Sequence, residues 1–376
     1  MAEYKHSEND LRQMQSLPLG AKVRMTENRI RWWVDEYGED GVYISFSGGK
    51  DSTVLLHLVR QMYPSIQAVF VNTGLEYPSV GAFARSKDNV AVIRPEMSFK
   101  EVLLRYGYPI ISKEVAECVS QARKGLESGN GYYLYRLAKL QGTAVDKRGR
   151  KSLYNQEKWK FLLNAPFAIS HICCNVMKKK PAKKFNRENN KKPFIGTMAA
   201  ESRLRKQQWM KNGCNGFDMK NPVSNPLSFW TENDILQYIQ ENGLEIADAY
   251  GKVVFDEKTC KYHTTGCMRT GCVFCLFGIT QDRERIANLQ IKEPRLADYV
   301  LKGGEFGEKG YWQPSKEGLG YWFVIEWLNI HGLGIVTYND IDYAGIYGNE
   351  RTAEILLKER IKTKMKTQEV ADDSND

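Results

Sequence analysis

The spacing of hydrophobic residues near the start of the chain predicts a helix. Within residues 20–37, Val23, Ile30, Trp33 and Val34 fall close to one face of a helix with 3.6 residues per turn. The glycine-containing stretch 38–41 ends this pattern. We therefore expect an amphipathic helix just before the first strongly apolar run of the chain.

Short apolar runs then alternate with helix-like segments. The runs 42–46, 67–71 and 91–93 are typical of buried strands, and the segments 52–63 and 79–88 between them have helical patterns. Strands that alternate with helices form parallel sheets, because each connection crosses over a face of the sheet. The pattern predicts an α/β fold: a mostly parallel sheet with helices on both faces, plus a small, cysteine-containing, helical C-terminal module.

Three further elements are expected downstream. A basic helix is predicted from Met177 and a strand at 193–196. The sequence TENDILQYIQ predicts a helix whose N-cap is Thr231, with Asp234 in the first turn, where a negative charge is favourable.

These elements divide the chain into four expected regions, one of which contains an insertion. The insertion, at about 120–165, is rich in Gly, Lys and Tyr and is interpreted as a lid. The regions are an N-terminal helical segment (1–40), a nucleotide-binding domain (41–250), a cysteine cluster with an aromatic-rich helical cap (251–352) and a charged tail, partly disordered (353–376).

Composition agrees with a globular protein. Of the 376 residues, 42% are hydrophobic and 26% are charged. The apolar stretch 321–336 is too short to span a bilayer and is interrupted by Glu326, Asn329 and His331. The first residues contain no apolar run, so no secretory signal is expected. We therefore predict a cytoplasmic location and no membrane partner. The net charge of +9 suits either a nucleotide or a larger polyanion.

The strongest chemical signal is Ser45–Ser52, with the sequence SFSGGKDS, between a predicted strand and a predicted helix. Gly48 and Gly49 let the backbone approach an anion, and the amides that open a helix favour negative charge. Ser47 and Ser52 add hydroxyl groups. Lys50 supplies a counter-charge and Asp51 a contact for Mg²⁺. A bare Gly-rich turn is the alternative, but the complete string favours a nucleotide site. It is not a Walker A loop, because residue 44 is isoleucine.

SGGKDS resembles the PP-loop of N-type ATP pyrophosphatases, enzymes that cleave ATP between its α and β phosphates. Other motifs resemble the phosphoadenosine phosphosulfate (PAPS) reductase-like branch of that family. They are Asn72-Thr73-Gly74-Leu75-Glu76-Tyr77-Pro78; Ile195-Gly196-Thr197 followed by Glu201-Ser202 and Arg205; and Asn225-Pro226-Leu227 followed by Trp230, Asp234 and Tyr238-Ile239. The resemblance covers roughly residues 40–280 and implies an adenine nucleotide alpha hydrolase-like fold.

The same resemblance implies the nucleotide site. Bound ATP and Mg²⁺ are expected there, with Lys50, Asp51 and Arg205 as catalytic residues. Glu201 and Arg205, four residues apart, could alternatively form a surface ion pair on one helix. The residues expected to bind the nucleotide are Ser45, Ser47, Gly48, Gly49, Ser52, Asn72, Thr73, Gly74, Glu76 and Gly196.

The eight cysteines indicate a metal site. Cys260, Cys267, Cys272 and Cys275 lie within sixteen residues, which in a reducing cytosol favours metal binding over disulfides. A local zinc site could use the last three with Cys260 or His263. Cys118 and Cys214 stand alone and are expected to be small core residues.

An iron–sulfur cluster is the other interpretation of these cysteines. Cys173-Cys174, followed by Lys178-Lys179 and Pro181, resembles a segment of iron–sulfur adenylylsulfate reductases, in which a later C-x-x-C completes a [4Fe–4S] cluster. This resemblance implies Cys174, Cys267, Cys272 and Cys275 as ligands, with Cys173 and Cys260 in reserve.

One departure from the sulfonucleotide reductases bears on function. Those enzymes use a C-terminal cysteine as nucleophile, but no cysteine follows Cys275 here, so reduction by the usual route is not expected. The leading hypothesis is an ATP-dependent adenylating sulfurtransferase with an iron–sulfur cluster, similar to DNA phosphorothioation ATPases and tRNA thiolation enzymes. The alternatives are a sulfonucleotide reductase that uses an external thiol and a non-catalytic nucleotide- or nucleic-acid-binding component of a defence complex. The acceptor, the sulfur-donor protein and the oligomeric state stay open.

A basic stretch next to Cys174 allows two interpretations. It is either a solvated face or a binding surface for phosphates of tRNA, DNA or a nucleotide. Its members are Lys178, Lys179, Lys180, Lys183, Lys184, Arg187, Lys191 and Lys192.

Overall fold

The computed structural model describes residues 4–338 and 340–372, and these form two compact units. The first unit comprises residues up to 96 together with 177–273, and the second comprises 97–176 together with the chain from 274 onwards. The expected regions were continuous in sequence, whereas each unit is assembled from two separated stretches. The chain leaves the first unit after β3 and returns to it at the basic helix.

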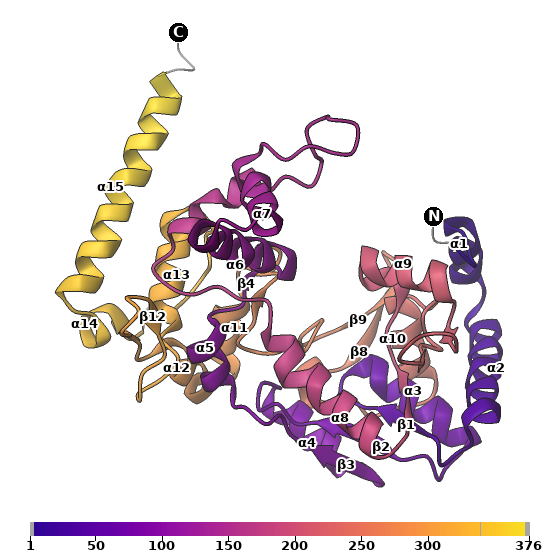
Figure 1. Cartoon of the computed structure of the whole chain (residues 1–376). Coiled ribbons are helices and arrows are strands. Elements are labelled where there is room, and N and C mark those ends of the chain that lie inside the picture. Colours follow the sequence, from indigo (N-terminus) through magenta and orange to yellow (C-terminus); the bar gives the residue numbers. More distant parts are fainter. Residues whose placement is uncertain (1–3, 339, 373–376) are drawn as a thin grey trace. The chain divides into compact units, whose positions relative to one another are not determined.

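The first unit contains the sheet (Figure 1). Its elements are α1 (Glu8–Ser16), α2 (Leu19–Tyr37), β1 (Val42–Ser45), α3 (Lys50–Met62), β2 (Ala68–Val71), α4 (Pro78–Ser86), β3 (Val90–Ile93), α8 (Lys180–Glu188), β5 (Lys192–Ile195), the 3₁₀ turn Ala199–Glu201, α9 (Arg203–Asn212), β6 (Asn215–Gly216), β7 (Val223–Ser224), α10 (Glu232–Glu241), the 3₁₀ turn Asp248–Tyr250, β8 (Val253–Asp256) and β9 (Lys261–Thr264). A π-helical turn, Asn175–Lys179, leads into α8. The segments predicted at 20–37, 42–46, 67–71 and 91–93 are confirmed as α2, β1, β2 and β3, each within a residue or two of its expected ends.

The sheet has the order β3-β2-β1-β5-β7-β6, and only the β6–β7 pair is antiparallel. Side chains of β1 alternate between its two faces. Val42 and Ile44 belong to the main core together with residues of α2 and α3. Tyr43, between them, contacts α8 on the other face: its ring lies 5.1 Å from that of Phe185, centroid to centroid. Helices therefore cover both faces, and the predicted α/β class is confirmed.

The helix expected after Thr231 is α10, and its N-terminus is capped as predicted. The Thr231 hydroxyl accepts a hydrogen bond from the amide of Asp234, and the Asp234 carboxylate accepts one from the amide of Thr231. Asp234 also receives the buried ammonium group of Lys22 at 2.7 Å. Trp230, just before the cap, is fully buried and donates from Nε1 to Thr26, so it is a packing residue.

The second unit is mainly helical. Its elements are α5 (Phe99–Tyr106), β4 (Ile110–Ile111), α6 (Lys113–Ser128), α7 (Gly131–Gln141), the 3₁₀ helix Glu157–Asn164, β10 (Leu276–Phe277), α11 (Arg285–Lys292), α12 (Pro294–Leu301), β11 (Glu305–Phe306), β12 (Trp312–Gln313), α13 (Tyr321–Ile330), α14 (Tyr343–Tyr347) and α15 (Glu350–Asp372). The aromatic residues expected in its C-terminal part form a core, in which Tyr108 and Tyr321 pack edge to face.

The segment 120–165, expected to be an insertion, is an integral part of this second unit. It includes the end of α6, all of α7 and a 3₁₀ helix, with Leu140 and Leu162 fully buried. Arg123 of α6 donates three hydrogen bonds of 2.8 Å to the carbonyl groups of Leu162, Ala165 and Phe167. These bonds join α6 to the end of the 3₁₀ helix and to the residues that follow it, and no sequence periodicity signals them.

The tail also differs from the expectation. Residues 350–372 form the helix α15, whereas the sequence predicted a partly disordered tail from 353; the last four residues of that prediction lie outside the described part of the chain. Cys118 and Cys214 are buried, as predicted for small core residues. No helix in the described ranges is both long and apolar enough to cross a membrane.

Candidate nucleotide site

The predicted motifs meet at one edge of the sheet. β2, β1 and β5 are adjacent parallel strands, so the residues after Val71, Ser45 and Ile195 emerge at the same carboxyl edge. Ligands of open parallel sheets bind at this edge. A cleft of about 450 Å³ lies there, entirely within the first unit. Its lining comprises Ser45, Phe46, Ser47, Gly49, Lys50, Asp51, Ser52, Phe70, Val71, Glu76, Lys178, Ala182, Ile195, Gly196, Thr197, Met198, Glu201, Arg205, Glu232, Tyr250, Arg269, Thr270 and Gly271.

The turn between β1 and α3 is shaped by two serines and a glycine. The Ser47 and Ser52 hydroxyl oxygens lie 3.1 Å apart, and the Ser47 hydroxyl accepts a hydrogen bond from the Gly49 amide. Gly48 has φ +72°, and a Cβ atom there would lie 2.7 Å from the carbonyl oxygen of Val80. Only glycine fits this position without strain. The turn therefore places two hydroxyl groups beside the first amides of α3.

The N-cap residue of α3 is Gly49, so no N-cap side chain bonds the first amides of the helix. Its first amide, that of Lys50, donates to the hydroxyl of Tyr250 at 3.3 Å. An uncapped helix start concentrates partial positive charge, which favours an anion.

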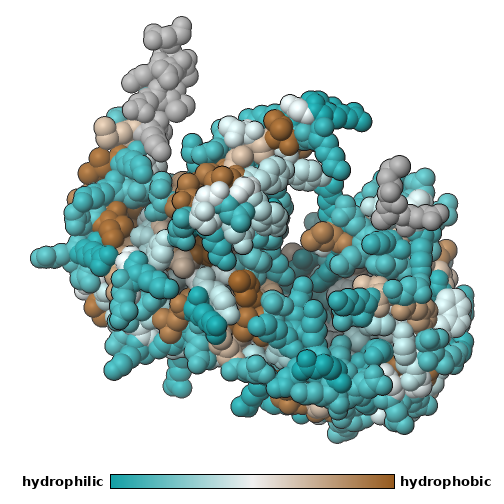
Figure 2. All heavy atoms as spheres, viewed as in Figure 1, coloured by the Kyte–Doolittle hydropathy of each residue, from teal (hydrophilic) through white to brown (hydrophobic). Residues whose placement is uncertain are grey.

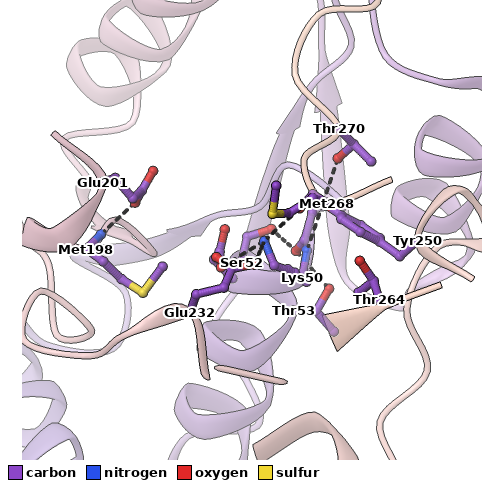
Figure 3. A network of polar contacts seen from close by, with 12 residues as sticks. Lys50, Ser52, Thr53, Met198, Glu201, Glu232, Tyr250, Thr264, Met268 and Thr270 are labelled. Carbon is purple, nitrogen blue, oxygen red and sulfur yellow. Dashed lines mark hydrogen bonds and ion pairs between the residues drawn. The ribbon is translucent and has the colours of Figure 1, made fainter. Parts of the chain in front are cut away.

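Lys50 is almost fully buried, and its ammonium group contacts acidic groups (Figure 3). Nζ lies 2.9 Å from Glu232 Oε1 and 3.7 Å from Asp51 Oδ1. Burial disfavours its charged form, but the two carboxylates outweigh that effect and raise the pKa of Lys50. The side chain therefore stays a cation at the base of the cleft.

The surroundings of Asp51 disfavour its charged form. Its Oδ1 atom is buried and accepts no hydrogen bond from the residues described. Burial raises the pKa of Asp51 to about 6; Lys50 opposes this shift, and the carboxylate of Glu232 adds to it. An ionised carboxylate with an unused buried oxygen is suited to a cation that arrives with a ligand.

The predicted turn after β2 positions one acid. The Thr73 hydroxyl donates to Glu76 Oε1 at 2.6 Å, and the Thr73 amide donates to its other oxygen. Glu76 lines the cleft. Asn72, Thr73 and Gly74 form the turn itself, with Gly74 at φ +72°, and within the described chain they are not among the lining residues. Their predicted part in nucleotide binding stays a prediction.

The motif after β5 contributes from the opposite side of the loop. A Cβ atom on Gly196 would lie 3.0 Å from the carbonyl oxygen of Asp51, so the absence of a side chain lets β5 approach the start of α3. Arg205 and Glu201 line the cleft as an ion pair. They do not share one helix as expected, because the 3₁₀ turn ends at Glu201 and Ser202 caps α9.

Among the lining residues that were not assigned to the site from sequence are Glu232, Lys178, Tyr250 and Arg269. Glu232 stands in the first turn of α10, and Lys178 belongs to the basic stretch and to the segment that resembles iron–sulfur adenylylsulfate reductases. Tyr250 and Arg269 carried no motif. Tertiary structure brings all of them to the loop, and Figure 3 shows Glu232 and Tyr250 converging on Lys50.

The predicted cysteine ligands are divided between the units. Cys260, Cys267 and Cys272 belong to the first unit; Cys173, Cys174 and Cys275 belong to the second. Considering residues 4–338 and 340–372, no group of three or more His, Cys, Asp or Glu side chains is placed to hold a metal ion. Thiolates are chemically suited to iron–sulfur or zinc, and which cysteines bind a metal stays a prediction.

The basic stretch lies mainly on α8 and the turn before it. Lys179, Lys180, Lys183 and Arg187 are exposed, and Lys184 pairs with Glu96 at 2.9 Å. The surface around α8 in Figure 2 is mostly hydrophilic. Aromatic side chains could stack on the bases of a nucleic acid. Phe194 and Trp209, near this stretch in the sequence, are core residues, whereas Tyr132 and Tyr135 of the second unit are exposed.

Comparison with known proteins places the chain in a family. A model of the phosphoadenosine phosphosulfate reductase domain matches residues 41–123 and 134–275, which is more than half of the chain. The chain is similar to the phosphoadenosine 5'-phosphosulfate reductase of Xylella fastidiosa (strain M23), with 32% identity over 99 residues, 25% of this chain and 41% of that protein. It is also similar to the adenosine 5'-phosphosulfate reductase of Geobacillus kaustophilus, with 26% identity over 109 residues, 27% of this chain and 46% of that protein.

The chain thus spans less than half the length of these relatives. Among solved structures, the phosphate complex of a phosphoadenylyl-sulfate reductase from Candida auris matches 59% of this chain and 82% of its own chain, with 14% identity and a TM-score of 0.34. The family model carries the assignment, because it includes the loop, the strand-end motifs and the cysteines up to Cys275. The chain belongs to the phosphoadenosine phosphosulfate reductase family.

Proposed function

We propose that the chain binds an adenine nucleotide whose phosphates lie against the turn 47–52. The observation that carries this proposal is the uncapped start of α3 at a cleft, beside the Ser47 and Ser52 hydroxyl groups and the ammonium group of Lys50. Lys178, Arg205 and Arg269 add positive charge to the same lining. Amides, hydroxyl groups and cations together are the usual partners of phosphate oxygens.

The acidic groups favour ATP with Mg²⁺ as the ligand. Asp51 and Glu232 both approach the ammonium group of Lys50, which lies at the loop. Magnesium is commonly held by one or two carboxylates together with substrate phosphates, so a complete protein site of three ligands is not required. The buried, unused oxygen of Asp51 fits this role. A bound magnesium ion would offset the negative charge of the phosphates beside these acids.

The proposed reaction is adenylation followed by sulfur transfer. An oxygen of the acceptor would form a bond to the α-phosphorus of ATP, and the bond to the β-phosphate oxygen would break, releasing pyrophosphate. A sulfur nucleophile from a donor protein would then displace AMP. Lys50, Arg205 and the start of α3 would neutralise the charge that develops on the phosphates. The acceptor class proposed is a nucleotide or a nucleic acid such as tRNA or DNA, and the cysteines would hold an iron–sulfur cluster or, alternatively, zinc.

Calorimetry with ATP, with and without magnesium, tests the nucleotide proposal. We expect magnesium-dependent binding and slow formation of AMP and pyrophosphate, both lost in Asp51→Ala. Asp35→Ala, at an exposed aspartate of α2 that is not among the lining residues, is the matched control and should bind ATP normally. Undiminished turnover by Asp51→Ala would refute the proposed role of this carboxylate. Binding without turnover in the presence of candidate acceptors would favour a non-catalytic role.

A sulfonucleotide reductase is the second candidate, and the names of the relatives support it. The same cleft could hold the phosphosulfate end of adenylylsulfate or PAPS, because sulfate and phosphate oxygens have similar hydrogen-bonding needs. Reduction to sulfite needs two electrons, which an external dithiol such as reduced thioredoxin would supply as it becomes a disulfide. Sulfite release from these nucleotides with reduced thioredoxin, independent of magnesium and ATP, would favour this candidate over the first.

A further inference from the structure

The segment 265–273, called here the cysteine segment, is connected by hydrogen bonds within the first unit to the turn 47–52, which is the proposed phosphate site. It carries Cys267 and Cys272 and follows β9. The amides of Gly266 and Cys267 donate to the carbonyl groups of Tyr250 and Ala249, both at 2.8 Å. A Cβ atom on Gly266 would lie 2.5 Å from the Ala249 carbonyl oxygen, so the two stretches are in close contact.

The hydroxyl group of Tyr250 joins this segment to the start of α3. It lies 2.6 Å from the Thr270 hydroxyl oxygen and accepts the hydrogen bond from the Lys50 amide. Tyr250 is 2% exposed, so water does not replace these contacts easily. A second connection runs from the Lys50 ammonium group to the carbonyl oxygen of Met268 at 3.4 Å. Figure 3 shows Lys50, Tyr250, Met268 and Thr270 as one connected group.

The cysteine segment also faces the nucleotide directly. Arg269, Thr270 and Gly271 line the cleft, and they lie between Cys267 and Cys272 in the chain. A chemical change at either cysteine that displaces the backbone by a fraction of an ångström therefore also moves the guanidinium group of Arg269 and the hydroxyl group of Thr270, which line the cleft. The other end of the segment is held by the hydrogen bond from the Val273 amide to the Leu75 carbonyl oxygen, in the turn that positions Glu76.

We infer that Tyr250 is a positioning residue that couples nucleotide binding to the chemical state of Cys267 and Cys272. This inference rests on the proposed nucleotide site. A thiolate-binding metal or a covalent thiol modification shifts the cysteine segment, and the Tyr250 hydroxyl group transmits that shift to the Lys50 amide. By thermodynamic linkage, a nucleotide on the loop must alter the affinity of the two thiolates for a metal by the same factor by which the bound metal alters nucleotide affinity.

The test measures maleimide labelling of individual cysteines by peptide mass spectrometry, on the full-length protein as purified, with and without saturating ATP and magnesium. Typical couplings between sites correspond to about fivefold or more in affinity. We expect ATP to change the labelling rate of Cys267 or Cys272 by about fivefold, and we expect labelled protein to bind ATP more weakly. Cys214, which is buried elsewhere in the first unit, is the internal reference and should label at an unchanged rate.

Two variants separate coupling from a general loss of structure. Tyr250→Phe keeps the ring, over which the Lys50 ammonium group lies at 5.6 Å, and removes only the hydroxyl group. The ATP affinity of this variant is measured first; at ATP concentrations that saturate it, ATP should no longer change the labelling rates. Tyr238→Phe removes a comparable buried hydroxyl group, which bonds to His57 Nδ1 at 3.0 Å, and should keep the full effect.

The outcomes distinguish the inference from the function on which it rests. If the wild-type protein binds no nucleotide, the proposed function and the inference both fail. If it binds ATP while the labelling of both cysteines is unaffected, the coupling is refuted and the nucleotide site stands. If Tyr250→Phe keeps the whole effect of ATP on labelling, the coupling does not pass through this hydroxyl group and the assignment of Tyr250 is overturned.

Discussion

Replacing Asp51 by asparagine should make the protein more stable while weakening magnesium-dependent nucleotide binding. The wild-type carboxylate is buried at the start of α3, with one oxygen that accepts no hydrogen bond from any described residue. Burial raises its pKa from 3.8 to about 6 in spite of the nearby Lys50. At neutral pH the folded protein therefore holds a charge that the unfolded chain accommodates more easily. Asparagine has nearly the same shape and removes that charge.

The pKa shift sets the size of the effect. A tenfold change in an ionisation constant corresponds to about 1.4 kcal/mol. A pKa raised from 3.8 to about 6 thus costs at most about 3 kcal/mol of folding free energy at pH 7. The Asp51 side chain is 26% exposed, and solvent reduces this cost, so we expect asparagine to stabilise the fold by about 1–2 kcal/mol.

The pH dependence follows from the direction of the shift. Because the folded pKa is the higher one, the favourable protonated form is fully present below about pH 4 and is lost as the pH rises through about 6. Asparagine does not titrate. The stability difference between the variant and the wild type should therefore be small at pH 4 and reach its full size above pH 7.

Thermal unfolding in EDTA without nucleotide, at pH 4 and pH 7.5, measures this difference. For a domain of this size we expect a Tm increase of about 2–6 °C at pH 7.5. Asp234→Asn is the matched control, since that carboxylate has the Lys22 ammonium group at 2.7 Å and should lose stability instead. In calorimetry, ATP affinity with magnesium should fall at least about tenfold in Asp51→Asn. If Asp51→Asn were no more stable than the wild type at pH 7.5, while Asp234→Asn behaved as expected, our account of Asp51 would be incorrect.

Three further outcomes are expected. Gly48→Ala places a Cβ atom 2.7 Å from the Val80 carbonyl oxygen and should lower the free energy of unfolding in urea by about 2–3 kcal/mol. Gly74→Ala, with the same φ and no neighbour within 4 Å, should lower it by only about 1 kcal/mol, and equal losses would argue against the close contact at Gly48. In Arg123→Lys the lysine side chain cannot make the three hydrogen bonds of 2.8 Å that the guanidinium group makes, so the second unit should lose about 2–3 kcal/mol of stability. Hydrogen exchange in residues 157–168 should become faster, and unchanged exchange would contradict this expectation. The affinity for ATP with magnesium should fall more steeply from pH 7.5 to pH 5.5 in the wild type than in Asp51→Asn, because only the wild type also protonates Asp51. Equal falls in calorimetry would show that this carboxylate is not a magnesium ligand.

The local patterns of the sequence were sufficient for the elements of the sheet and for the loop. A run such as 42–46 between polar turns can only be a buried strand or a short core helix, and the following SGGKDS string is compatible with one local geometry. The glycine turn and the amides that open α3 are properties of a few consecutive residues, so sequence reasoning reached them, whereas φ +72° at Gly48 is known only from the structure. The capping of α10 by Thr231 is local in the same way.

The assembly of units was decided by contacts between residues far apart in the chain. The helices after residue 113 look like an irregular insertion, because their stability comes from Arg123 bonding to carbonyl groups about forty residues away. The return of the chain to the first unit at α8 likewise depends on packing, because the ring of Phe185 on α8 contacts the ring of Tyr43 on β1.

The amino-acid sequence by itself determined the α/β class, the glycine turn between β1 and α3 and the family to which the chain belongs, because each of these depends on short stretches with a repeated period or a fixed spacing. Only the tertiary structure decided which other groups face that turn. Glu232, Tyr250 and Arg269 lie about 180 to 220 positions along the chain from the loop and reach it through the packing of α10 and the cysteine segment. At that junction the neighbouring carboxylates keep Lys50 charged in spite of burial, and burial raises the pKa of Asp51, so the surroundings rather than the residue types set the charge balance.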